Sequence, residues 1–178
     1  MNTREATLEL FTVKNVVTEI ILVSVAILMP VLLHLVPGVN VFALLPMHWT
    51  IFAAGLLYGW RGGLIAGLSA PCLSFMMTGM PVAMALPLMV PELAVYGLVS
   101  GILREKTKIN QFVILLAASA AGRITYLAFA LVLGRVENLT QFAAKAFLPG
   151  AIAALAIIAV VPFMAKGIRT LLEGSAEK

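Results

Sequence analysis

Long apolar runs, interrupted by short polar or Gly/Pro segments, make up most of this chain. The runs lack the two-residue alternation of barrel strands, so they predict helices. Pro37-Gly38, the Gly59–Gly63 corner and the charged stretch Arg104–Lys108 are the clearest breaks. Pro30, Pro149 and Pro162 fall inside apolar runs and predict kinks. The expected helices cover about residues 15–36, 46–58, 63–77, 87–103, 109–133 and 142–168.

The composition is that of a membrane protein. Hydrophobic residues make up 62% and charged residues 11% of the 178 positions, against roughly 45–50% and 25% in soluble domains. Backbone groups inside a bilayer must be satisfied within the segment, which favours helices. The first apolar run, residues 16–36, is too long for a signal-peptide core, so we expect a retained helix. The sequence therefore predicts an all-α membrane protein, with residues 1–178 forming a single membrane domain.

Basic residues indicate the orientation of this compact bundle of six transmembrane helices. If the N-terminus is cytoplasmic, only Arg135 and Lys145 lie outside. Nine others lie in cytoplasmic segments, namely Arg4, Lys14, Arg61, Arg104, Lys106, Lys108, Lys166, Arg169 and Lys178. This excess predicts that both the N- and C-termini are cytoplasmic. In an alternative with five helices, residues 46–77 form one re-entrant hairpin.

Arg123 is the candidate functional residue that the sequence singles out most clearly. It falls inside the predicted fifth helix, where a charge is costly unless it is paired or hydrated. Glu92, near the outer start of the fourth helix, is the expected partner, either in an ion pair or as the opposite wall of a polar pocket. A guanidinium suits a ligand carboxylate or phosphate, whereas Glu92 would suit a cationic ligand. In a purely structural alternative, the pair only ties two helices together.

Further polar and aromatic residues are expected at the same outer end. Tyr96 follows Glu92 by four residues and shares its helix face, and Tyr126 follows Arg123 by three. His48 lies near the outer end of the second helix. Asn40 and Thr78 fall in apolar outer loops. Together these groups predict a small-molecule site over one outward-facing cavity, although each aromatic alone is more typical of a core or interface position than of ligand contact.

The remaining signals argue against catalysis and against nucleic-acid binding. Cys72 is the only cysteine, and the sequence has no His-rich or paired acidic metal motif and no glycine-rich phosphate loop. Scattered basic residues do not form a nucleic-acid surface. Ser69 resembles an intramembrane protease serine only faintly, because both histidines precede it. We expect the chain to bind no cofactor and to have no enzymatic activity. A ligand-free envelope scaffold is the main alternative function.

Several segments in their order resemble the substrate-binding S components of energy-coupling factor (ECF) transporters. The resemblance is carried by Leu45–Trp49, Ala54–Gly59, Gly63–Gly67, Ser69–Pro71, Thr78–Pro81 and Pro91–Gly97. It covers about residues 40–105 by motif and the rest by helix pattern. It implies an importer subunit in a prokaryotic cytoplasmic membrane that binds a vitamin or cofactor precursor. Its implied partners are a transmembrane coupling subunit and two ATPases.

In the family, the loops after helices one and three cover the site and helices four to six line it, so Glu92, Tyr96, Arg123 and Tyr126 lie on matching helices. The first helix departs from the family pattern. It lacks the Ala-x-x-x-Ala motif that contacts the coupling subunit, and its small residues are Thr18, Ser24 and Ala26. Glu19, near its cytoplasmic end, is either an interface residue or part of a solvated helix end, and we expect the solvated end.

Overall fold

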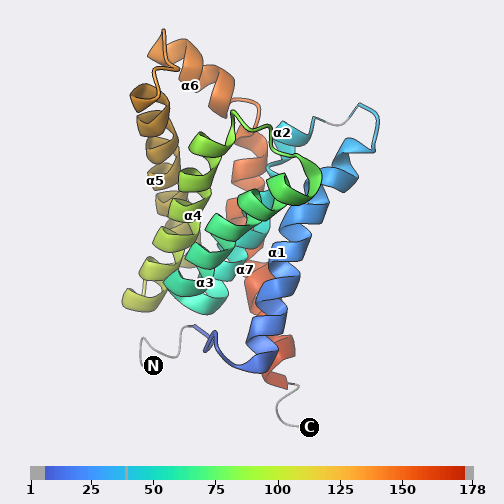
Figure 1. The fold of residues 1–178 in the computed structure, drawn as a ribbon. Coiled ribbons are helices and arrows are strands. Elements are labelled where there is room, and N and C mark those ends of the chain that lie inside the picture. The colour runs from blue at the N-terminus through green and yellow to red at the C-terminus, as the bar shows by residue number, and fades with distance from the viewer. Residues whose placement is uncertain (1–6, 39, 175–178) are drawn as a thin grey trace.

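The chain folds into a bundle of helices in the computed structural model, which describes residues 7–38 and 40–174 (Figure 1). No strand occurs in these ranges, which confirms the all-α prediction. The helices are α1 (Val13–His34), α2 (Val41–Leu44), α3 (Pro46–Thr78), α4 (Leu86–Lys106), α5 (Gln111–Val132), α6 (Leu139–Phe147) and α7 (Ala151–Gly174). Within the described residues, five of them, α1, α3, α4, α5 and α7, are long and apolar enough to cross a membrane.

The chain reverses direction inside α3, at Gly59. This residue has φ 70° and ψ −160°, a combination open to glycine and strained for other residues. Gly55 and Gly63, on either side of it, both face the carbonyl of Gly97 on α4, so the two halves of α3 run back along each other. Glu105 accepts a hydrogen bond from the Trp60 amide at 3.2 Å and supports the second half where it begins. The corner expected from the sequence is present, although the helix resumes at once after Gly59.

The core is built around α3. In the most apolar stretch of α3, 72% of the residues are buried. The corresponding share is 28% for α1 and 22% for α5. Gly63 and Gly67 allow the backbone of α3 to lie directly on that of α4. Figure 1 shows α3 between α1 and α4. The outer helices α1, α5 and α7 consequently present apolar side chains outward, as a lipid-facing surface requires.

The predicted helix over residues 142–168 is wrong, because the structure has two helices there. α6 ends at Phe147 and α7 begins at Ala151. Pro149 has no backbone N–H and crowds the preceding turn, which ends α6. Gly150 is buried against Leu45, so tertiary packing stabilises the break between α6 and α7. Pro30 and Pro162 remain within α1 and α7.

The other boundaries differ by a few residues. α1 covers Val13–His34 where the prediction was 15–36, and α4 continues through Lys106. The apolar outer loop expected around Asn40 contains the short helix α2. Asn110 caps α5 by accepting a hydrogen bond from the Phe112 amide at 3.0 Å. Both described chain ends lie at one end of the bundle, and α2 and α6 lie at the opposite end (Figure 1).

Candidate functional site

A cavity of about 300 Å³ lies at the α2/α6 end of the bundle. Residues from α1, α3, α4, α5 and α6 line it, together with the connection between α3 and α4. Most of its wall is apolar, with three methionines, whereas its polar groups come from few residues. The lining residues are Pro30, His34, Leu45, Pro46, Met47, His48, Met80, Pro81, Val82, Ala85, Met89, Glu92, Arg123, Tyr126 and Ala146. An apolar cavity with a few convergent polar groups is typical of a small-molecule site.

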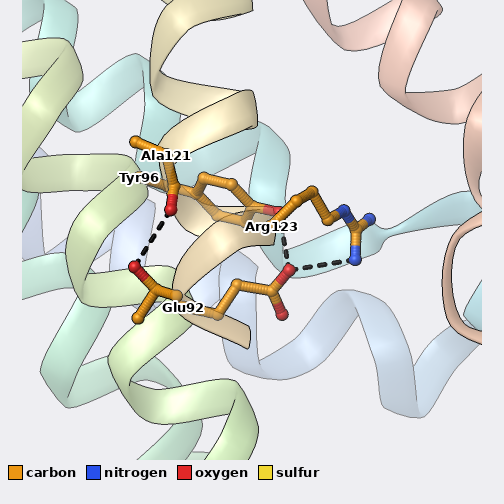
Figure 2. A network of polar contacts seen from close by, with 5 residues as sticks. Glu92, Tyr96, Ala121 and Arg123 are labelled. Carbon is orange, nitrogen blue, oxygen red and sulfur yellow. Dashed lines mark hydrogen bonds and ion pairs between the residues drawn. The ribbon is translucent and has the colours of Figure 1, made fainter. Parts of the chain in front are cut away.

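Glu92 is the centre of a polar network in the wall of this cavity (Figure 2). Its Oε1 accepts a hydrogen bond from the Tyr96 hydroxyl at 2.6 Å and forms an ion pair with Nη1 of Arg123 at 2.9 Å. Glu92 and Tyr96 are one turn apart on α4, and Arg123 comes from α5. The side chain of Glu92 is 4% exposed and that of Arg123 is 22% exposed. The arginine therefore presents the accessible part of the pair.

Gly122 allows α5 to come close enough for this ion pair. A Cβ at Gly122 would overlap the ring of Tyr96. Without that side chain, α5 packs directly against the tyrosine, and the next residue, Arg123, reaches Glu92. The Gly122–Tyr126 segment thus brings α5 close to α4 at Gly122 and places the charge of Arg123 next to that contact.

Aromatic residues from α6 cover the outer side of the arginine. The guanidinium carbon of Arg123 lies 4.8 Å from the ring centroid of Phe147, a distance that allows a cation–π interaction. The rings of Phe142 and Phe147 each lie 6.1 Å from that of Tyr126. Phe147 was not expected in the site, because the sequence placed it inside one continuous helix over residues 142–168.

His48 is buried, and neither of its ring nitrogens has a hydrogen-bond partner in the described part of the chain. Its ring packs 5.2 Å from that of Tyr96. Leu45, with φ 49°, turns the chain just before Pro46 starts α3, so His48 falls in the first turn and lines the cavity. Buried polar groups are usually satisfied. The imidazole is thus an unpartnered polar group beside the cavity, with neither nitrogen open to solvent in this structure.

Asn40 and Thr78 lie near the α2/α6 end but outside the cavity lining. Asn40 caps α2, because its Oδ1 accepts from the Ala43 amide at 3.3 Å. The Thr78 hydroxyl donates to the Ser74 carbonyl at 2.7 Å and accepts from the Met80 amide at 3.2 Å. Both side chains therefore stabilise local backbone. Tyr96 lies beneath the cavity and reaches it through Glu92.

Several lining residues were not expected from the sequence. His34 closes the last turn of α1, where its Nδ1 lies 2.6 Å from the Pro30 carbonyl. Met80, in the α3–α4 connection, and Met89, on α4, also line the cavity. The Thr78–Pro81 motif marks a break in the chain next to Met80. It does not indicate whether the Met80 side chain faces the cavity.

The chain was compared with protein families, curated proteins and solved structures. The family model described as "ECF transporter, substrate-specific component" matches residues 14–171. Neither the curated proteins nor the solved structures gave a match. The family match extends well beyond the motifs of residues 40–105 and includes both members of the Glu92–Arg123 pair. This chain therefore belongs to the family of substrate-specific components of ECF transporters.

Proposed function

We propose that this chain captures a small anionic solute, a vitamin or related micronutrient with a carboxylate or phosphate group, from outside the cell. The observation that carries this proposal is the partial exposure of Arg123 in the wall of a mostly apolar cavity, while its partner Glu92 is almost fully buried. Membership of the family supports solute binding as the role of the chain.

The asymmetry within the ion pair favours an anionic ligand over a cationic one. Glu92 Oε1 already accepts from both Tyr96 and Arg123, so Glu92 mainly orients the arginine. A guanidinium carries five N–H donors in a planar fork, and only Nη1 is used by Glu92. The remaining donors suit the two oxygens of a carboxylate or phosphate.

The cavity also limits the size of the solute. Its volume of about 300 Å³ is at the lower end of the range for small-molecule pockets. Met47, Met80 and Met89 form an adaptable apolar wall. His48 adds one hydrogen-bonding group. A solute with one small apolar or ring portion and one anionic group fits these features.

We also propose six membrane crossings, with the two halves of α3 each counted as one and both termini in the cytoplasm. The Gly59 corner of α3, which Arg61 follows, and the α4–α5 connection, which contains Lys108, lie at the same end as the described termini. The α5–α6 connection, which contains Arg135, and α6, which contains Lys145, lie at the cavity end. This distribution supports an outward-facing cavity. The proposed partners are a transmembrane coupling subunit and two ATPases in a prokaryotic cytoplasmic membrane, as the family suggests.

The test identifies the solute and then measures its affinity. Native mass spectrometry of gently extracted protein should reveal a co-purifying anion, and calorimetry should give its Kd. Arg123→Ala should weaken binding by about 10–100-fold, because a charge-assisted hydrogen bond contributes about 1.5–3 kcal/mol. Lys145→Ala is the matched control, because this residue is on α6 outside the cavity lining. The solute affinity of this variant should stay within about twofold of the wild-type value.

An unchanged affinity in folded Arg123→Ala protein would contradict the proposal. If that variant does not fold, the Arg123→Gln/Glu92→Gln double variant removes both charges and keeps similar shapes. Its binding should be lost as well. A co-purifying cation with no anionic group would instead favour the carboxylate of Glu92 as the anchor.

A further inference from the structure

The inward-facing side of α1 leads to the solute cavity. Its buried residues repeat at intervals of three or four and include Asn15, Glu19, Leu22, Ala26 and Pro30. The expectation of a solvated Glu19 was therefore wrong. His34 is the next position on this side of the helix, four residues after Pro30, and both residues line the cavity. The last turn of α1 thus forms one wall of the cavity.

His34 differs from the earlier residues on this side of α1 because it is exposed. The earlier residues are buried in the bundle, whereas His34 lies where the bundle gives way to the cavity. Its ring is attached to α1 itself, because Nδ1 lies 2.6 Å from the Pro30 carbonyl oxygen. Histidine side chains near a helix end can bond to the last carbonyls in this way. One edge of the ring is therefore occupied, and the other edge is open.

The contact with Pro30 decides which ring nitrogen of His34 carries the proton. A carbonyl oxygen accepts hydrogen bonds and cannot donate them, so Nδ1 carries the hydrogen and donates. In a neutral imidazole the second nitrogen, Nε2, then keeps its lone pair and is an acceptor. The described residues place no hydrogen bond on Nε2. The α1 wall of the cavity thus offers a hydrogen-bond acceptor.

Arg123 offers the opposite kind of group from another part of the wall. A guanidinium only donates, and Glu92 contacts Nη1 of its three nitrogens. Arg123 comes from α5 and His34 from α1, and these helices lie on opposite sides of the bundle with α3 and α4 between them (Figure 1). The cavity therefore has donors on its α5 side and an acceptor on its α1 side, within a mostly apolar wall.

We propose that His34 is a specificity-determining residue, whose Nε2 accepts a hydrogen bond from an N–H or O–H group of the solute. This inference rests on the proposed function, in which Arg123 binds the anionic group of the same solute. It narrows the solute to an anion that carries a separate donor, such as a hydroxyl, an amide or a ring N–H. A site that bonds a substrate donor discriminates against analogues without it, because its own polar group is then left unpaired.

The tautomer of His34 can be measured without any solute, because the chain has only two histidines. Protein labelled with ¹⁵N-histidine is placed in lipid nanodiscs at about pH 8, where a free imidazole is neutral. We expect the nitrogen spectrum of His34 to show a protonated Nδ1 and an unprotonated Nε2. The spectrum of His34→Gln assigns the signals, because one imidazole is lost. A protonated Nε2 in the wild type overturns the inference.

Probes of defined chemistry then test the donor. The meta and para isomers of hydroxybenzoate carry a carboxylate, a ring and an O–H donor, and their methyl ethers lack only the donor. Calorimetry should show at least one hydroxybenzoate binding the wild-type chain about 2–12-fold more tightly than its ether, as expected for one hydrogen bond. His34→Leu should abolish this preference. His34→Gln keeps an acceptor oxygen and should retain part of it.

Leu35→Ala is the matched control, because Leu35 is 74% exposed and outside the cavity lining, and this variant should keep the full preference. If His34→Leu does not fold, His34→Phe carries the same test. Equal affinities for each hydroxybenzoate and its ether in the wild type, or a preference that persists in His34→Leu, overturn the role of His34. Arg123→Ala should still weaken the binding of all four probes in that case. Probe affinities that Arg123→Ala leaves unchanged contradict the proposed function instead, and binding of no probe contradicts both.

Discussion

Gly63 of α3 and Gly97 of α4 lie backbone against backbone. A Cβ added to either residue would overlap main-chain atoms of the other. Gly55, on the first half of α3, also faces the Gly97 carbonyl. One glycine on α4 therefore holds both halves of α3, and this contact fixes where Glu92 and Tyr96 lie relative to His48.

Gly97→Ala should destabilise the chain, because the overlap is with backbone atoms that cannot turn aside. A loss of about 1–3 kcal/mol is typical of overpacking, which lowers Tm by roughly 2–10 °C in a chain of this size. Gly167→Ala is the control, because nothing lies near a Cβ there, and its Tm should hold or rise slightly. Equal Tm values for Gly97→Ala and the wild type would show that α4 can shift freely.

Arg123→Gln should destabilise the chain more than the Arg123→Gln/Glu92→Gln double variant does. The single variant leaves Glu92 buried without its cationic partner, and breaking such a pair costs about 3–5 kcal/mol. The double variant leaves no unpaired charge. Thermal unfolding of wild type, both single variants and the double variant completes the cycle. Additive losses would show that the two residues act independently.

His48→Phe should separate stability from binding. The phenyl ring keeps the contact with Tyr96 and removes two unpartnered buried nitrogens, so Tm should be unchanged or higher. Solute affinity, measured with the ligand found by mass spectrometry, should fall by about tenfold because one hydrogen bond is lost. Met47→Leu, an apolar exchange in the same wall, is the control. Wild-type affinity in His48→Phe would remove His48 from the site.

Phe147→Ala should expose Arg123 to reagents from the α2/α6 end. The Phe147 ring covers the guanidinium at 4.8 Å, so its removal should increase the rate of phenylglyoxal modification at Arg123. Peptide mass spectrometry gives that rate, with Arg61 as an internal reference. Leu148→Ala is the matched control, because Leu148 is 71% exposed. An equal rate in the wild type and Phe147→Ala would show that α6 does not shield the arginine.

Cysteine labelling should distinguish six membrane crossings from five. In a Cys72→Ala background, Glu137→Cys should react with an impermeant maleimide in intact cells. Arg61→Cys and Lys108→Cys should react only after permeabilisation, since all three positions are exposed and the two basic ones lie at the proposed cytoplasmic end. Protection of Arg61→Cys in permeabilised cells would favour the re-entrant hairpin.

The residues of the candidate site show how far the sequence prediction reached. Arg123 and Glu92 were recognisable because a charge within an apolar run requires a partner, and the structure pairs them. Asn40 and Thr78 were expected in the site on position alone, and their side chains instead bond to nearby backbone. Glu19 looked solvated because it is near a helix end. Its burial depends on α3, which a single helix pattern does not reveal.

The sequence by itself determined which segments are membrane helices and which charges need neutralising, because both follow from the cost of moving a residue or its neighbours into hydrocarbon. The tertiary structure alone decided which side chains share the cavity. That outcome depends on glycines that bring α3, α4 and α5 into close contact, on the break between α6 and α7, and on the rotation of each helix. These are long-range packing effects, and they place Phe147 over Arg123 and bury Glu19 of α1.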